Sequence, residues 1–190
     1  MLSVRCTGLP IVVMTGFLLS SCAVAPRFVY VTNMESDDVS TYTMDGYTGR
    51  LTPVAGSPFK AGGGPYGLAL APSGKFVYVA NYNSDNVSGY VVNTETGSLA
   101  PIPGSPFTAG KNPMGIAIVP SGRFAYVVNS GTSNLAFWPA SNISTYAIDA
   151  RTGALAPLPG PPSAAGKQPF AIAVDSLGRF VYVAHLYTNN

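Results

Sequence analysis

Short segments in which apolar and polar residues alternate recur along the chain at a nearly constant interval. The pattern Phe-x-Tyr-Val, with a basic residue before it and an Asn or His two positions after it, appears four times, at 27–33, 75–81, 123–129 and 179–185. Phe28, Phe76 and Phe124 are each 48 residues apart, and Phe180 follows after 56. The longer last interval places an insertion within 130–142. Because alternation with period two is typical of half-buried strands, the pattern predicts a β-strand at each recurrence.

Each repeated unit contains four strand signals in the same order. In the second unit they cover 66–71, 76–81, 87–93 and 99–103, each bounded by Gly, Pro, Asn or Ser. A Pro-Ser-Gly turn separates the first two signals and recurs in the third unit, and a Thr-Gly turn precedes the fourth signal in three units. Gly supplies the positive φ that tight hairpins need, so the strands are predicted to be antiparallel neighbours.

Tandem four-stranded units of about 40 to 50 residues are typical of β-propeller blades. Solenoid repeats are an alternative, but parallel β-helix coils are shorter, and this sequence lacks the regularly spaced leucines of leucine-rich repeats. We therefore predict an all-β fold, a partial β-propeller of about three and a half four-stranded antiparallel blades over 27–190. Units starting near 27, 75, 123 and 179 give about thirteen short strands and no helix longer than about three turns after Pro26.

The repeat carries the motifs of a known family. Tyr30-Val31-Thr32-Asn33 is the motif that gives the Tyr-Val-Thr-Asn repeat its name, and Gly-Ser-Pro-Phe occurs at 56–59 and 104–107. Across 27–185 the chain resembles the lactonase-type propellers related to 6-phosphogluconolactonase. The resemblance is specific for the fold and implies a ring of seven blades, but the shared residues belong to the scaffold and specify no reaction.

The resemblance also implies that the chain holds about half of a ring. Seven such units would need about 340 residues, whereas the chain has 190. One interpretation is a truncated or fragmentary family member. Another is that a second copy of the chain, or a different chain, completes the propeller.

The N-terminal segment has the features of a lipoprotein signal peptide. Arg5 supplies a positive charge, 9–19 is apolar, and Leu19-Ser-Ser-Cys22 resembles a bacterial lipobox. We expect a signal peptide over 1–21, a short linker over 22–26, and a lipid on Cys22 that anchors the exported protein in the cell envelope, at the outer membrane in a Gram-negative host. The alternatives are cleavage without lipidation and an uncleaved helix, although Pro10 and Gly16 would interrupt such a helix.

The composition of the chain argues against several classes of partner and site. Charged residues make up 9% of the chain and its formal net charge is +2, with basic residues scattered singly, so no nucleic-acid partner is expected. One His and eight acidic residues that do not cluster predict no metal site. The sequence contains neither a Gly-x-Ser-x-Gly elbow nor a phosphate-cradling loop, and no cofactor is expected.

In propellers of the resembled kind, two sets of loops meet on the face around the central channel: those between the second and third strands, and those leading into the next blade. The position that ends each Phe-x-Tyr-Val motif adjoins this face, and it is occupied by Asn33, Asn81, Asn129 and then His185. Asn81 and Asn129 are candidate ligand-binding residues, and His185 is a candidate general base because it titrates near neutrality. The alternative is that each Asn caps a turn through its own backbone and His185 replaces it as a loop hydrogen-bonder.

Two further features map to the same face. Lys111 and Lys167 are equivalent residues of successive units, and two cations there could hold a carboxylate or polarise a lactone carbonyl. Trp138, in the insertion, could stack against a sugar or an apolar ligand. The alternatives are solvated lysines and an aromatic pair, Phe137 and Trp138, that covers a blade edge.

These features predict an exported lactonase-like propeller protein that presents loops to a ligand or partner at the cell envelope, the ligand being a small molecule or a glycan. The alternative function is hydrolysis of a lactone, in which water attacks at the channel mouth and cationic groups stabilise the oxyanion. A third interpretation is a non-functional remnant. The sequence leaves open whether the protein is an enzyme.

Overall fold

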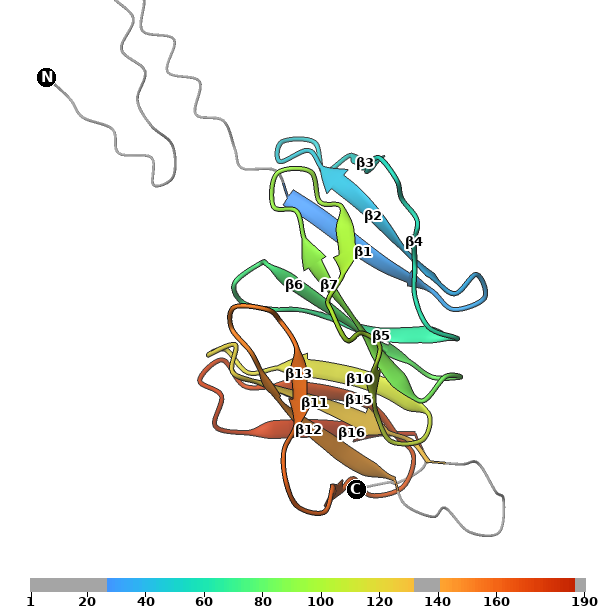
Figure 1. The fold of residues 1–190 in the computed structure, drawn as a ribbon, viewed down its shortest axis with the longest axis vertical. Helices are drawn as coiled ribbons and strands as arrows, with labels where there is room; N and C mark the ends of the chain where they lie inside the picture. The colour runs from blue at the N-terminus through green and yellow to red at the C-terminus, as the bar shows by residue number, and fades with distance from the viewer. Residues whose placement is uncertain (1–26, 132–140, 187–190) are drawn as a thin grey trace, which may run out of the picture.

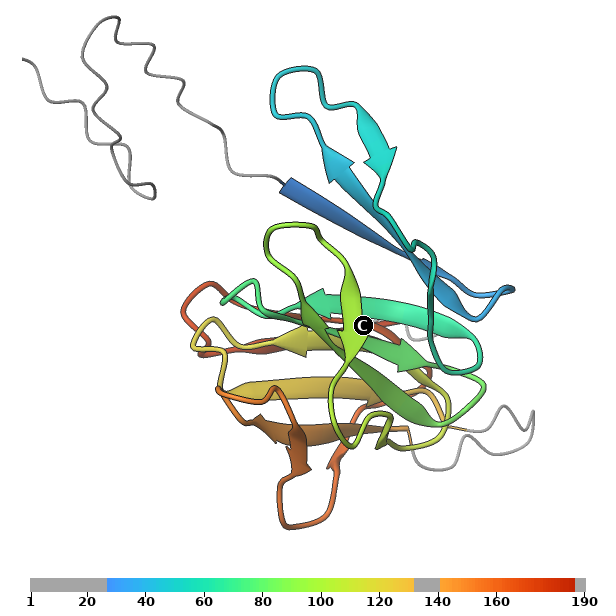
Figure 2. The ribbon, with the colours of Figure 1, turned by 45° about the horizontal axis from the view of Figure 1, so that its top comes forward.

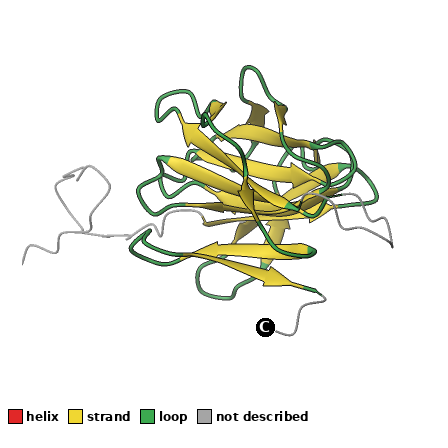
Figure 3. Cartoon of the chain, turned by 90° about the horizontal axis from the view of Figure 1, so that it is seen from below, coloured by secondary structure: helices red, strands yellow, loops and turns green. Residues whose placement is uncertain are grey.

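The computed structural model describes residues 27–131 and 141–186 (Figure 1). Every regular element in these residues is a β-strand, and Figure 3 shows strands joined by loops without a helix. The strands form four separate antiparallel sheets that follow one another along the chain. The all-β prediction is therefore confirmed.

The four sheets correspond to the repeated units of the sequence. The first contains β1 (Arg27–Asn33), β2 (Asp38–Met44), β3 (Leu51–Pro53) and β4 (Phe59–Lys60). The second contains β5 (Pro65–Leu70), β6 (Phe76–Asn81), β7 (Asn86–Val92), β8 (Leu99–Pro101) and β9 (Phe107–Thr108). The third contains β10 (Pro113–Ile118), β11 (Phe124–Asn129), β12 (Asn142–Ile148), β13 (Leu155–Pro157) and β14 (Ser163–Ala164). The fourth contains β15 (Pro169–Val174) and β16 (Val181–His185). We call these sheets blades one to four.

The described part of the chain has the thirteen expected strands and three more of two residues each, β4, β9 and β14. Each short strand pairs with the beginning of β2, β7 or β12, as Asn86 pairs with Thr108 and Val87 with Phe107. The other end of β2, β7 or β12 pairs with β3, β8 or β13. The expected outer strand is therefore split into two pieces, because Gly and Pro bend the chain between them.

Apolar residues of both faces of β6 build the core between blades. Phe76, Tyr78 and Ala80 belong to the cluster that joins blades two and three, whereas Val77 and Val79 belong to the cluster that joins blades one and two. All six residues of β6 are buried. Alternation with period two thus buries one set of side chains against each neighbouring blade.

The first strands of blades two to four lie next to one another, and Figure 2 shows these blades stacked. Glycine permits the close approach. A Cβ on Gly67 would lie 2.3 Å from the carbonyl oxygen of Met114, and one on Gly115 would lie 3.2 Å from the backbone nitrogen of Ile172. Backbone of one blade therefore contacts backbone of the next without an intervening side chain.

Candidate functional site

The loops at one end of the blades are joined by backbone hydrogen bonds, and we call them together the loop face. It comprises 34–37, 61–64, 82–85, 109–112, 130–131, Ser141 and 165–168. Each segment that leads into a new blade lies between two loops. Ala61 donates its N–H to the carbonyl of Asp37 (2.9 Å), and the carbonyl of Gly64 accepts from the N–H of Tyr82 (2.8 Å). The predicted meeting of the two sets of loops is confirmed.

Aspartate side chains reinforce the first two contacts between these loops. The Oδ1 atom of Asp37 accepts a hydrogen bond from the N–H of Gly64 (2.7 Å), and Oδ1 of Asp85 accepts one from the N–H of Asn112 (2.9 Å). The second carboxylate oxygen of Asp85 accepts from Nζ of Lys111 at 2.5 Å. Each carboxylate therefore ties the loop of one blade to the segment that leads into the next.

The environment of Asp85 favours its charged form. Partial burial acts to raise its pKa, but the hydrogen bonds from Lys111 and from the Asn112 amide, together with the Lys111 charge, outweigh that effect. The pKa of Asp85 consequently lies below its ordinary value. Lys111, one of the two candidate lysines, is therefore engaged in an ion pair at the protein surface.

The third contact between loops has a different composition. Ser141 occupies the place of Asp37 and Asp85, since its carbonyl accepts from Ala165 (3.1 Å) as theirs do from Ala61 and Ala109. Its hydroxyl donates to the carbonyl of Ser130 (2.9 Å). Lys167 is exposed, and within 27–131 and 141–186 it forms no ion pair.

The candidate residues Asn81 and Asn129 are fully buried. Nδ2 of Asn81 donates to Oδ1 of Asn86 (2.7 Å) and to the Ser88 hydroxyl (2.9 Å), so it ties the second strand of its blade to the third. Nδ2 of Asn129 makes the equivalent bonds to Asn142 and Ser144 (both 2.8 Å). The interpretation of these residues as backbone turn caps is wrong, because their amides reach side chains of the neighbouring strand.

A glycine covers each buried amide. A Cβ on Gly62 would lie 2.6 Å from Nδ2 of Asn81, and one on Gly110 would lie 2.5 Å from Nδ2 of Asn129. The Oδ1 atoms of both asparagines are buried without a hydrogen-bond partner. Ligand binding by these two residues stays a prediction, and it would require the covering backbone to move.

His185 takes the asparagine position in blade four. Its Nε2 atom is hydrogen-bonded to the carbonyl of Ala165, and the ring lies against Gly166. The N–H of Leu186 donates to the carbonyl of Gln168 (3.2 Å). His185 of β16 thus contacts the short segment 165–168, which also contains Lys167. A role of His185 as a general base stays a prediction.

Two other candidates lie outside the described residues. Trp138 falls within 132–140, and Cys22 falls within 1–26. Among the residues that the structure describes, no three His, Cys, Asp or Glu side chains come together in a way that could hold a metal ion. No helix in those residues is long and apolar enough to cross a membrane.

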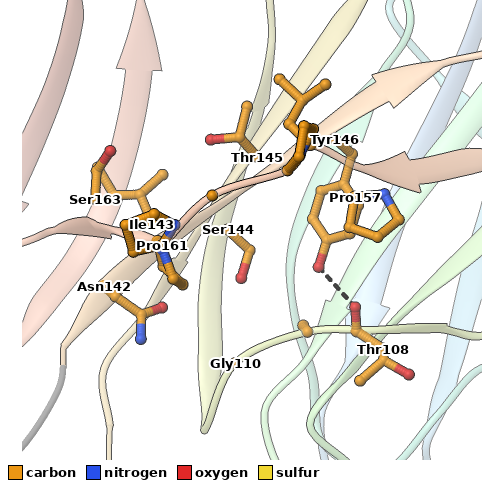
Figure 4. Close-up of a pocket in the computed structure, with 15 residues that line it drawn as sticks. Thr108, Gly110, Asn142, Ile143, Ser144, Thr145, Tyr146, Pro157, Pro161 and Ser163 are labelled. Atoms are coloured by element: carbon orange, nitrogen blue, oxygen red, sulfur yellow. Dashed lines mark hydrogen bonds between the residues drawn. The ribbon is translucent and has the colours of Figure 1, made fainter.

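Blade three contains a pocket of about 510 Å³, not predicted from the sequence, between β12 and the segment 157–163 (Figure 4). Tyr146 lines it and donates its hydroxyl to the carbonyl of Thr108 (2.7 Å). Ile143 is paired with Ser163 there, whereas the equivalent residues of blade two are Val87 and Phe107. The pocket thus lies beside Ser163, at the position where blade two has the phenyl ring of Phe107.

The signal for this pocket was present in the sequence. Blades one and two contain Gly-Ser-Pro-Phe, and the equivalent segment of blade three is Gly-Pro-Pro-Ser at 160–163. In blade two, Oγ of Ser105 accepts the N–H of Gly89 (2.9 Å). Pro161 stands at the position of Ser105 and offers no such acceptor.

The fold and its repeats correspond to a known family. The family model described as Lactonase, 7-bladed beta-propeller, matches residues 20–108 and 102–190. The chain belongs to this family. A search of curated proteins gives no match.

Solved structures show the same fold. A putative 6-phosphogluconolactonase from Bacteroides uniformis is 20% identical, with a TM-score of 0.69 over 83% of this chain and 44% of that one. A protein from Lactobacillus plantarum is 24% identical, with a TM-score of 0.66 over 84% of this chain and 45% of that one. The periplasmic gluconolactonase PpgL of Pseudomonas aeruginosa is 24% identical, with a TM-score of 0.59 over 72% of this chain and 38% of that one. The chain thus spans less than half the length of these three structures.

Proposed function

We propose that this chain is an exported member of the lactonase propeller family that binds a small polar ligand or a glycan through its loop face at the cell envelope. The observation that carries the proposal is the construction of that face. Carboxylate contacts fix its loops at the first two blade contacts, and the third presents the exposed cation Lys167. Fixed loops that carry exposed polar groups bind ligands with little ordering cost.

Export is supported by the N-terminal sequence. Leu19-Ser-Ser-Cys22 follows an apolar run, and a thiol placed there is suited to carry a lipid. One of the similar structures is described as a periplasmic gluconolactonase, an envelope protein of the same fold. The test is metabolic labelling with a fatty acid. Label should be lost in Cys22→Ser and kept in the matched variant Cys6→Ser, and label that persists in Cys22→Ser refutes lipidation at this residue.

Binding at the loop face is tested by charge reversal at two exposed cations. Lys167 lies on the loop face, whereas Arg151 lies in the turn between β12 and β13, at the opposite end of the same blades. The full-length chain should retain sugar acids, neutral sugars or glycans on an immobilised panel. Lys167→Glu should lower that retention and Arg151→Glu should not. Equal losses in the two variants would contradict the proposal.

Hydrolysis of a lactone is the second candidate function, favoured by family membership and by the contact of His185 with the segment 165–168, which contains Lys167. Glucono-1,5-lactone is the substrate to assay first, with acid release followed by a pH indicator. His185→Asn is the informative variant, because asparagine occupies the equivalent position in the other three blades. A rate that falls to background in this variant supports the general-base role, and an unchanged rate removes it.

The last described sheet supports a proposal about partners. Leu177, Phe180 and Tyr182 of blade four are 68%, 55% and 60% exposed. We propose that a second copy of the chain or another chain covers these side chains, because a blade buries its apolar surface against a neighbour. Sedimentation velocity of the full-length chain should show a species larger than the monomer. A concentration-independent monomer would contradict the proposal.

A further inference from the structure

The three contacts between successive blades on the loop face share one backbone hydrogen bond and differ in the side chains around it. In each contact, the loop that follows β1, β6 or β11 accepts an alanine N–H from the segment that leads into the next blade. The accepting residues are Asp37, Asp85 and Ser141, and the distances are 2.9, 3.0 and 3.1 Å. The contacts therefore form a series in which the third can be compared with the first two.

In the first two contacts the aspartate carboxylate occupies a site made by the linking segment. The site consists of a backbone amide, that of Gly64 or Asn112, and in the second contact also the ammonium group of Lys111. Asn112 has a φ of 51° and Gly64 a φ of 63°. A left-handed residue in this place turns its N–H toward the neighbouring loop, where the carboxylate accepts it.

The third linking segment has the same donors. Gln168 has a φ of 45°, so the backbone follows the same left-handed turn, and Lys167 stands in the place of Lys111. The side-chain oxygen of Gln168 is buried without a hydrogen-bond partner.

The carboxylate is missing from this third contact. Ser141 is shorter than aspartate, and its hydroxyl is bonded to the carbonyl of Ser130, away from the linking segment. The inserted residues 132–140 contain no Asp or Glu. Among the residues that the structure describes, neither the ammonium group of Lys167 nor the backbone amide of Gln168 has an acidic partner.

We infer that the third contact is a binding site for the carboxylate of a free organic acid, which takes the position that the side chain of Asp85 holds in the second contact. One carboxylate oxygen accepts the N–H of Gln168, and the other accepts from Lys167, as the two oxygens of Asp85 do from Asn112 and Lys111. Hydrogen bonds between ionised groups are the stronger class, and two of them fix the orientation of the ligand. The inference rests on the proposed role of the loop face in ligand binding.

The chemical class of the ligand follows from the site. A planar carboxylate has two oxygens, one for each donor, and therefore matches the donor pair. Chloride is a single acceptor atom that both donors would have to share. The opening of a sugar lactone produces a hydroxy acid, so an acid of this class is the natural first probe. D-Gluconate carries the carboxylate, and D-glucose is a neutral polyhydroxyl control of similar size.

The test is calorimetric titration of the full-length chain with sodium D-gluconate, at an ionic strength held constant with sodium chloride, with D-glucose as the control. The wild-type chain should bind one gluconate. Ser141→Asp places a tethered carboxylate in the site and should weaken gluconate binding by roughly tenfold or more. Lys167→Gln should weaken it by roughly tenfold, and Arg151→Gln, on the opposite end of the blade, should leave it unchanged.

A gain-of-function variant makes the test independent of loss of folding. Asp85→Ser reproduces the third contact at the second, where Lys111 and the Asn112 amide lose their partner. This variant should bind two gluconate ions. Circular dichroism identifies any variant that does not fold, and Ser141→Asp and Lys167→Gln then decide the question alone.

The outcomes separate this inference from the proposed function. Gluconate binding that is unchanged in both Ser141→Asp and Lys167→Gln overturns the carboxylate site. Binding of D-glucose or a lactone without binding of gluconate overturns it as well and leaves the proposed function standing. The absence of binding by gluconate, glucose and lactone alike overturns both.

Discussion

The hydroxyl of Tyr78 in blade two donates a hydrogen bond of 2.7 Å to the carbonyl oxygen of Gly153 in blade three. The two residues are 75 positions apart in the chain, and Tyr78 is fully buried in the cluster between the blades. Burial also raises the pKa of the Tyr78 hydroxyl, so it remains protonated and keeps its role as a donor. The bond thus fixes the turn of one blade against the core of the preceding one.

Replacing Tyr78 with phenylalanine tests this bond. The ring would still fill the core, but the carbonyl of Gly153 would lose its donor, and we expect a loss of about 1 kcal/mol in the free energy of unfolding. Urea denaturation monitored by circular dichroism measures the change. Tyr47→Phe is the control, because Tyr47 is 87% exposed in the turn between β2 and β3 and loss of its hydroxyl should have no effect. A wild-type midpoint in Tyr78→Phe would show that the bond contributes nothing.

Position 153 requires glycine, both for its backbone conformation and for the close approach of a neighbouring ring. Its φ is 75°, and a Cβ there would lie 2.5 Å from Cδ1 of Phe76. Gly153→Ala should therefore cost at least about 2 kcal/mol, from left-handed strain and displacement of the ring. Gly49 is the control, since it has a φ of 70° but no atom within 4 Å of its Cβ position. Equal melting temperatures for Gly153→Ala and Gly49→Ala would contradict the packing argument.

The pocket in blade three should accept the ring that blade two already holds. Ser163→Phe, combined with Pro161→Ser, gives blade three the complete Gly-Ser-Pro-Phe order of blades one and two, because Gly160 and Pro162 are already in place. Filling the space should raise the free energy of unfolding by about 1 kcal/mol. The reciprocal change Phe107→Ser should open an equivalent pocket in blade two and cost about 3 kcal/mol. Destabilisation by the double substitution would show that the pocket cannot hold a ring.

Asp149 should make stability depend on pH in acid. Hydrogen bonds from the backbone and side chain of Thr152, and from the N–H of Arg151, hold the pKa of Asp149 below its ordinary value. A group with a lowered pKa in the folded state stabilises it above the unfolded pKa of about 3.9, and this contribution is lost as the pH falls through the folded pKa. Asn93, in the equivalent turn of blade two, accepts the same pattern of bonds without titrating.

Asp149→Asn should therefore keep the turn and remove this part of the pH dependence. Melting temperatures measured from pH 5 down to pH 2 should fall less steeply in the variant than in the wild type. Asn93→Asp is the reciprocal control and should make the fall steeper. Identical slopes in all three proteins would show that these turns do not contribute to acid sensitivity.

The strands could be predicted from the sequence because each depends on local alternation. The expected 76–81 agrees with β6 (Phe76–Asn81), and the expected 66–71 and 87–93 differ from β5 (Pro65–Leu70) and β7 (Asn86–Val92) by one residue at each end. The fourth signal, 99–103, ends early at Pro101 in β8. The rest of β7 pairs with β9, a separate short strand that follows a bend in the chain. The alternation of apolar and polar residues did not predict this bend.

The candidate site was predicted less completely because its contacts join different blades. The sequence indicated Lys111 and Lys167 as equivalent positions, but the pairing of Lys111 with Asp85 depends on how two loops 26 residues apart meet. Asn81 and Asn129 were expected to adjoin the ligand-binding face, and both are fully buried there because a glycine of the linking segment lies over each amide. The equivalence of Ser141 to Asp37 and Asp85 could not be predicted from the sequence, because it depends on the hydrogen bond that each residue accepts from the next blade.

Hydrogen–deuterium exchange of the full-length chain, with and without saturating D-gluconate, tests the central claim that the loop face is the binding surface. The account predicts slower exchange in peptides that contain Ser141 and 165–168, and no change in the turns 45–50, 93–98 and 149–154 at the other end of the blades. Slower exchange confined to those turns, or no change at the loop face with gluconate, glucose or glucono-1,5-lactone, would contradict it.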